Sequence, residues 1–245
     1  MCLFNPERYY SISIAMRDRS IYIVQRDYPL LIGACGWSHT GWLAEFYPQD
    51  LPVDWCLSYY ANEFPVVLVT AEEWNLSEAA VSQWCEDTDV SFRFVVEITA
   101  NTVEELQPQL ERIVGFGDRC VGLLLATSLY ADATALKELL EVINSSGSLC
   151  LDFGADKPDA AVKHLLHQQQ IGWCWHGDGS AEGLSLGSLT VTRIYCQEAN
   201  PRQIRQWVET SLASSTQEGQ SILLFEGEPP NIAVMRQAQI ILDLL

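Results

Sequence analysis

The chain has 245 residues, of which 48% are hydrophobic and 19% charged, and this apolar content excludes a wholly disordered protein. Thirty-two acidic residues against fourteen basic residues give a formal net charge of −18, which repels phosphate groups. We therefore expect no nucleic-acid partner and no binding to an anionic membrane surface. No apolar stretch reaches about 18 residues and the N-terminus does not resemble a secretory signal, so the sequence predicts a cytoplasmic protein without a membrane span.

Eight short apolar runs alternate with longer amphipathic runs, and each short run predicts a β-strand. They cover residues 30–35, 66–70, 92–98, 120–125, 148–153, 171–175, 190–195 and 221–225. Several of these runs are almost continuously apolar, which is typical of parallel strands that are covered on both faces.

Apolar residues at helical spacing predict α-helices between most of these strands. Thr102, followed by Glu105, forms a capping-box pattern at the start of one helix. Asn200 directly before Pro201 is typical of the start of another. Residues 177–187 are the exception, because they predict a loop with little helix.

Eight strand–helix units in about 215 residues predict a single (β/α)8 barrel, a TIM barrel of the α/β class. The predicted barrel spans residues 30–245, and residues 1–29 form an N-terminal extension. The competing arrangement is an open, doubly wound sheet, which usually carries a GxGxxG turn after its first strand. Residues 33–36 read Gly-Ala-Cys-Gly and lack that spacing, so the sequence favours the barrel.

The densest local pattern lies at the first predicted strand and just after it. It reads Ile-Gly-Ala-Cys-Gly-Trp-Ser-His-Thr-Gly-Trp over residues 32–42 and Phe-Tyr-Pro over residues 46–48. Leu-Pro, a tryptophan, Tyr-Tyr-Ala and a phenylalanine follow between residues 51 and 64. This pattern resembles the YecE-like family, also called domain of unknown function 72. The resemblance implies a TIM barrel, but it implies no activity, because the biochemical role of that family is not settled.

The chain departs from the family pattern mainly at polar positions near the strand ends. Glu97 stands where relatives have a lysine, and Asp152 and Gly154 stand where relatives have a glutamate and an arginine. Arg193 matches the family. The other departures are Leu68, Thr70, Glu72, Glu73, Trp74, Thr127, Tyr195, Cys196, Glu226 and Gly227. The resemblance therefore implies a diverged member whose site has lost its ancestral chemistry or acquired a different ligand.

Acidic residues end or follow most of the predicted strands, so the mouth of the barrel is expected to be acidic. Glu97, Asp152 and Glu226 are candidate catalytic residues, because glycoside hydrolysis needs two carboxyl groups with different pKa values. Carboxylates crowded in a partly dry cleft repel one another, so at least one of them should have a raised pKa. If that repulsion has no use, Glu97→Gln should stabilise the fold.

A metal site is a second hypothesis, with Asp152, His176, Asp178 and Glu226 as candidate ligands. Cys174 and His176 are two positions apart and therefore share one face of a strand. The eight cysteines include no CxxC pair, which argues against a zinc ribbon and favours buried, reduced thiols. The sequence leaves the cofactor, and any metal, unknown.

A binding site without chemistry is the third hypothesis. Its candidate ligand-binding residues are Trp37, His39, Trp42, Glu73, Arg193 and Tyr195. The alternative is that the aromatic residues fill the top of the barrel and fix the first loop to its helix. The sequence therefore favours a barrel of unknown activity that is non-catalytic or binds a small-molecule ligand or a protein partner. The alternative is a hydrolase that uses the strand-end carboxylates, with or without a divalent metal.

Overall fold

The computed structural model describes residues 30–43, 45–74, 78–143, 148–214 and 219–245. Eight parallel strands of this part of the chain form one sheet, in the order β6-β5-β4-β3-β2-β1-β8-β7. They are β1 (Leu30–Cys35), β2 (Val66–Val69), β3 (Arg93–Thr99), β4 (Cys120–Ala126), β5 (Leu149–Asp152), β6 (Gly172–Trp173), β7 (Leu189–Tyr195) and β8 (Gln220–Glu226). The extension expected at residues 1–29 lies outside the described residues.

The sheet curls until its two edge strands meet. β1 pairs with both β2 and β8, so the first and last strands are neighbours. β6 and β7 meet at an isolated bridge between Trp175 and Thr192, where the Arg193 amide donates to the Trp175 carbonyl over 2.9 Å. The result is a nearly closed barrel, which confirms the predicted (β/α)8 fold and is incompatible with an open, doubly wound sheet.

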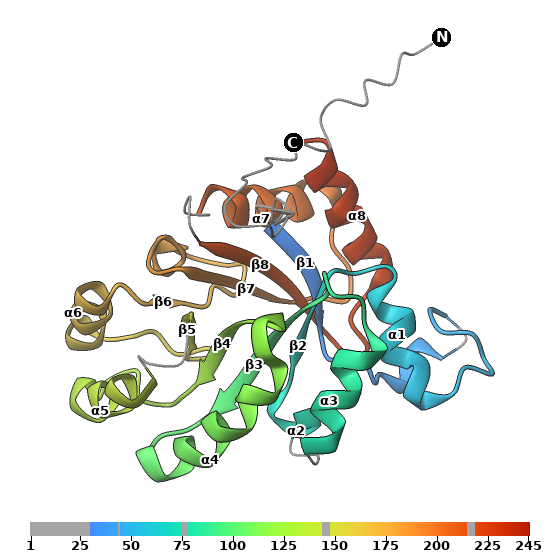
Figure 1. Cartoon of the computed structure of the whole chain (residues 1–245). Helices are drawn as coiled ribbons and strands as arrows, with labels where there is room; N and C mark the ends of the chain where they lie inside the picture. Colours follow the sequence, from blue (N-terminus) through green and yellow to red (C-terminus); the bar gives the residue numbers. More distant parts are fainter. Residues whose placement is uncertain (1–29, 44, 75–77, 144–147, 215–218) are drawn as a thin grey trace, which may run out of the picture.

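Helices surround the sheet (Figure 1). They are α1 (Cys56–Ala61), α2 (Ala71–Trp74), α3 (Glu78–Asp87), α4 (Val103–Ile113), α5 (Ala133–Ile143), α6 (Ala160–Gln169), α7 (Pro201–Ala213) and α8 (Ile232–Asp243). Short 3-10 turns are η2 (Thr40–Trp42), η3 (Val53–Trp55), η4 (Val114–Arg119) and η5 (Glu182–Ser185). η5 occupies the segment between β6 and β7, which agrees with the expected loop. None of the helices in the described residues is long and apolar enough to cross a bilayer.

The predicted helix starts have the expected caps. The Thr102 side chain accepts a hydrogen bond from the Glu105 amide, and Glu105 in turn accepts one from the Asn101 amide. Asn200 accepts from the Gln203 amide at the start of α7. These contacts satisfy amides that the first helical turn leaves without a partner.

Successive residues of each strand pack in two different cores. Ile32 of β1 faces the helices, whereas Leu31 and Cys35 face the barrel interior. Because side chains alternate between faces, a charged residue two positions beyond an interior residue reaches the rim on the same face. The interior residues Val95, Cys150, Cys174, Val191 and Leu224 are followed in this way by Glu97, Asp152, His176, Arg193 and Glu226.

Candidate functional site

One arginine lies among three carboxylates at the mouth of the barrel. Arg193 Nη1 donates to Glu97 Oε1 over 2.8 Å and to Asp152 Oδ2 over 3.2 Å. Its Nε and Nη2 donate to the two oxygens of Glu226 over 2.9 and 3.1 Å. We call these four residues the Arg193 cluster. The structure therefore brings together the three carboxyl residues that the sequence nominated for catalysis, and it adds the cation between them.

The arginine removes much of the repulsion expected between these carboxylates. Burial would raise the pKa of Asp152, but hydrogen bonds from His176 and the Gly154 amide, together with the charge of Arg193, lower it below its usual value. Asp152 is therefore not a carboxylate with the raised pKa that crowding predicts for at least one of the three. Three carboxylates against one guanidinium still leave an excess of negative charge.

Glu97 also connects the cluster to the backbone of a neighbouring element. Its Oε2 accepts a hydrogen bond from the Ala71 amide, at the start of α2, over 3.0 Å. The side chain of Glu97 is 12% exposed and that of Arg193 16%, whereas that of Glu226 is 36% exposed. Solvent therefore reaches the cluster mainly on the side of β8.

A histidine extends the cluster on the side of β6. His176 Nε2 lies 2.9 Å from Asp152 Oδ1, which also accepts a hydrogen bond from the Gly154 amide. This hydrogen bond to Asp152 raises the pKa of His176 in spite of its partial burial. Asp152 thus accepts from Arg193 through one oxygen and meets the imidazole through the other.

Two of the four predicted metal ligands, Asp152 and His176, lie together in the structure, and Cys174 lies beside them. The ligand atoms of Asp152, Cys174 and His176 all lie within 4.8 Å of one another. Asp178 is exposed, with its backbone carbonyl accepting from Trp175 Nε1, and Glu226 is bound by Arg193. The signal for Cys174 in the sequence is its shared strand face with His176, although Cys174 is absent from the ligands that the sequence predicts.

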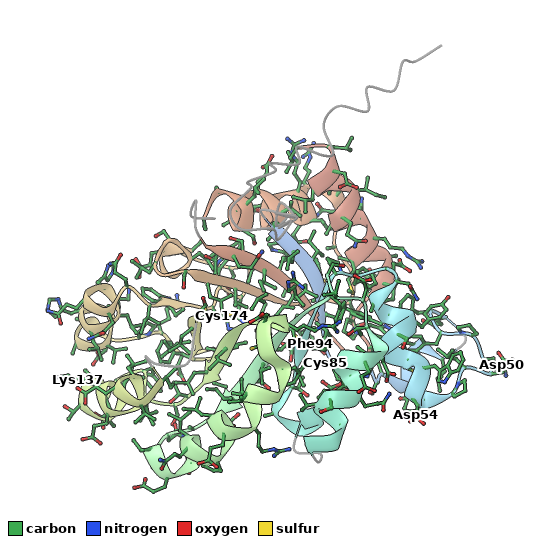
Figure 2. The ribbon with its side chains drawn as sticks, in the orientation of Figure 1. Asp50, Asp54, Cys85, Phe94, Lys137 and Cys174 are labelled. Carbon is green, nitrogen blue, oxygen red and sulfur yellow. The ribbon has the colours of Figure 1, made fainter. Side chains whose placement is uncertain are left out.

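A cavity of about 610 Å³ lies beside this group of residues. Its wall includes Cys174, His176, Trp173, Trp175, Lys157 and Asp178. It is formed by β6 and by the segments that follow β5 and β6, and we call it the β5–β6 cavity. Figure 2 shows Cys174 near the strands at the centre of the molecule, whereas Lys137 lies at the periphery.

The aromatic candidates from the first loop lie inside the protein. Trp37 is 5% exposed and packs edge-on against Trp84. Trp42 is 1% exposed, and its Nε1 donates to the Pro230 carbonyl over 2.8 Å. Their burial agrees with the alternative to a binding site, in which these aromatic side chains pack inside the protein.

The other four residues of the binding hypothesis, His39, Glu73, Arg193 and Tyr195, lie at separate places. His39 Nε2 lies 2.8 Å from the Cys35 carbonyl, and burial lowers the pKa of His39. Tyr195, at the end of β7, is 66% exposed. Arg193 belongs to the cluster already described.

Glu73 connects the loop after β1 to the end of β2 through hydrogen bonds. It accepts hydrogen bonds from the Thr70 amide and hydroxyl through Oε2 and from the Trp37 amide through Oε1. Burial raises the pKa of Glu73 in spite of these bonds. Gly36 has a φ of +75°, and a Cβ there would lie 2.9 Å from Glu73 Oε1. The positive φ and the close approach to the hydrogen-bonded Glu73 carboxylate favour glycine at this position.

Comparisons with solved structures identify the same fold at low sequence identity. CdNal from Clostridium difficile in complex with mannosamine has a TM-score of 0.54 at 11% identity, with 86% of this chain and 74% of that chain covered. D-psicose 3-epimerase with D-tagatose from Clostridium cellulolyticum H10 also has a TM-score of 0.54 at 11% identity, with 87% and 97% covered. This likeness shows the fold alone.

At the level of sequence, no curated protein matches the chain. The model of the family described as "Protein of unknown function DUF72" matches residues 31–245. This range covers the whole barrel, including the aromatic pattern after β1 and the strand ends that form the Arg193 cluster. The chain therefore belongs to the DUF72 family.

Proposed function

We propose that this DUF72 member is a ligand-binding barrel, which takes a small, positively charged molecule in the β5–β6 cavity and performs no hydrolysis with its strand-end carboxylates. The observation that carries this proposal is the binding of one guanidinium, that of Arg193, by Glu97, Asp152 and Glu226. The carboxylates of the cluster hold the side chain of Arg193, and their negative charge still exceeds its single positive charge.

The arginine disfavours the hydrolase alternative. A glycosidase needs one carboxyl group that remains protonated near neutral pH to act as the general acid. Arg193 contacts all three carboxylates, and the pKa of Asp152 is lowered, which disfavours Asp152 as that general acid. This electrostatic environment opposes the difference in protonation that two-carboxyl hydrolysis requires.

The charge around the cavity favours a cation. Six carboxylates belong to the Arg193 cluster or to the cavity wall: those of Glu97, Asp152, Glu226, Asp156, Asp178 and Glu182. The arginine of the cluster and the two lysines of the wall, Lys157 and Lys163, give three bases in the same region, and His176, whose pKa is raised, is a fourth. A small cation therefore gains electrostatic energy on entering, whereas an anion meets net repulsion.

The cavity wall already holds an ammonium group. Lys163 Nζ lies 5.9 Å from the centre of the Trp173 ring and forms an ion pair with Glu182. An aromatic face beside a carboxylate is an arrangement that binds amines through cation–π and charge interactions. This arrangement on the cavity wall favours a small amine as the ligand.

The test is a comparison of matched small molecules by ligand-observed NMR and by thermal melts. Putrescine and glucosamine are the amine probes, and 1,4-butanediol and glucose are their neutral counterparts. We expect the amines to bind and to raise the melting temperature, and we expect Glu182→Gln to weaken their binding. Gln239→Ala, in a separate cavity on the side of α8, is the control. Equal behaviour of amines and neutral counterparts, or equal effects of the two variants, would overturn the proposal.

A second candidate function is proton transfer by His176, favoured by its contact with Asp152 and its place on the cavity wall. A histidine oriented by a carboxylate is a common general acid or base. Chromogenic glycosides, esters and phosphates test both forms of catalysis. Turnover that is lost in His176→Gln would support the histidine reaction, and turnover lost in Glu226→Gln would support the carboxylate hydrolase. Either result would contradict a site without chemistry.

A further inference from the structure

We propose that Asp152, Cys174 and His176 form a binding site for a divalent metal ion of the zinc class at the inner end of the β5–β6 cavity. This inference does not rest on the amine-binding proposal: the two share Asp152, but a metal ion would be held by a thiol and an imidazole as well. Its basis is the convergence of a carboxylate, a thiol and an imidazole, whose ligand atoms all lie within 4.8 Å of one another.

The fold brings these three side chains together from two neighbouring strand ends. Cys174 and His176 lie on the segment that continues β6, two positions apart and therefore on one face. β5 pairs with β6 in parallel, and the Cys174 amide donates to the Leu151 carbonyl directly before Asp152. The backbone register thus holds the carboxylate beside the other two side chains.

The donor set fits zinc better than calcium or magnesium. Zn²⁺ binds sulfur, nitrogen and oxygen ligands together, whereas Ca²⁺ and Mg²⁺ prefer oxygen alone. Zinc–ligand bonds of roughly 2.0–2.3 Å place neighbouring ligand atoms about 3.3–3.8 Å apart. His176 Nε2 and Asp152 Oδ1, now 2.9 Å apart, would separate slightly around an ion. Three protein ligands would leave one position for water or another ligand from the cavity.

The surrounding contacts support both the orientation and the charge of such a site. Asp152 Oδ2 accepts from Arg193, which leaves Oδ1 directed at His176. The positive charge of Arg193 faces Glu97 and Glu226 as well as Asp152, so the immediate surroundings of a cation remain negative. Arg193 therefore acts as a positioning residue for the carboxylate ligand.

Access is provided by the β5–β6 cavity, because its wall includes both Cys174 and His176. Cys150 differs in this respect. It is also a buried thiol of the barrel interior, but the cavity wall does not include it. The two cysteines therefore form a matched pair for an experiment, since each is a small interior thiol and only one has the other two ligands beside it.

The experiment is titration of the full-length, chelator-treated protein with Co²⁺ and with Zn²⁺. We expect Co²⁺ to produce the near-ultraviolet charge-transfer absorption of a thiolate–metal bond and the visible bands of tetrahedral coordination. Cys174→Ser should abolish the charge-transfer band and weaken Zn²⁺ binding by more than about tenfold. His176→Gln should weaken it similarly, whereas Cys150→Ser should leave both readouts unchanged.

Three results would overturn the site. One is a wild-type protein without the thiolate band. Another is a band that persists in Cys174→Ser, because it would come from a different cysteine. The third is an equal loss in Cys150→Ser. Circular dichroism checks that each variant is folded. If Cys174→Ser does not fold, His176→Gln decides the question, because the side chain of His176 is 33% exposed at the rim.

Discussion

The Arg193 cluster and the aromatic residues after β1 are stabilised in different ways. The second group, which we call the aromatic corner, consists of Trp37, Trp42, Phe46, Tyr47 and Tyr60, all buried. Within it, Trp42 packs edge to face against Phe46 and Tyr47 and stacks on Tyr60, and the Tyr47 hydroxyl donates to the Trp37 carbonyl over 2.7 Å. The cluster instead holds charged groups whose partners are other charged groups.

The difference separates a region that supports the scaffold from one that can respond to a ligand. The aromatic corner gains stability from apolar burial and leaves little polar capacity free. The Arg193 cluster holds more negative than positive charge, and its Asp152 contacts His176, which lies on the wall of the β5–β6 cavity. The family pattern that the sequence resembles includes the corner, whereas the departures expected from that resemblance include Glu97, Asp152 and Glu226 of the cluster.

Among the substitutions that test this comparison, removal of Arg193 should change the stability of the protein most. Arg193→Ala leaves Glu97, Asp152 and Glu226 without their shared cation, and a broken buried ion pair destabilises a fold by about 3–5 kcal/mol. We expect a loss in the free energy of unfolding of this order, measured by urea denaturation at pH 7. Arg205→Ala, which removes an exposed ion pair with Glu209 on α7, is the control and should change stability by less than about 1 kcal/mol.

A similar stability of the two arginine variants would contradict the structural role assigned to the cluster. It would also weaken the case against hydrolysis, because that case depends on the binding of the three carboxylates by Arg193.

Loss of one hydroxyl from the aromatic corner should have the next largest effect. Tyr60 Oη accepts from the Ala34 amide over 2.7 Å and donates to the Val66 carbonyl over 2.9 Å. Tyr60→Phe leaves both backbone groups buried without this partner, which destabilises the protein by about 1–3 kcal/mol. Tyr59→Phe is the matched control on the same helix, since Tyr59 is 37% exposed. Equal melting temperatures of the two variants would show that the hydroxyl is not needed in the corner.

A neutral replacement for Glu97 should have a smaller effect, in the direction opposite to that expected from crowding alone. Glu97→Gln weakens the contact with Arg193 and places an amide group near two donors. We expect a destabilisation of about 1–2 kcal/mol in urea denaturation. Glu104→Gln on the exposed face of α4 is the control. A stabilised Glu97→Gln protein would mean that repulsion among the carboxylates outweighs their attraction to the arginine.

The pKa values of the two histidines next to these regions should be shifted in opposite directions. Asp152 raises the pKa of His176, whereas burial lowers that of His39. NMR titration of the imidazole protons in the presence of a chelator should find His176 above and His39 below the ordinary value of about 6.5.

The two histidines should also contribute to stability at opposite ends of the pH range. The contribution of His176 is fully present below its unfolded pKa and is lost as pH rises through its folded pKa. That of His39 is present above its unfolded pKa and is lost as pH falls toward its folded pKa. Urea denaturation of His176→Gln and His39→Gln as a function of pH measures both contributions. If both variants lost stability with the same pH dependence, the predicted opposite shifts in the pKa values of His176 and His39 would be contradicted.

Local sequence determined much of the scaffold. The apolar runs gave the strands because a strand covered on both faces needs few polar residues. The Thr102 and Asn200 patterns gave helix starts, because a capping side chain acts within a few residues of its own position. The alternation of side chains also indicated that Cys174 and His176 share a face. Each of these inferences depends on neighbours in the sequence.

Tertiary structure alone decided which of the strand-end residues meet. Arg193 is 96 positions from Glu97, and Trp42 is 188 positions from the carbonyl that accepts its indole N–H. Such contacts depend on the closure of the barrel and on the register of neighbouring strands, which local patterns do not encode. For the same reason, the sequence identified Asp152 and His176 as candidates but not the place of Cys174 beside them. A strand pattern fixes the face of a residue, and only the assembled barrel fixes its neighbours.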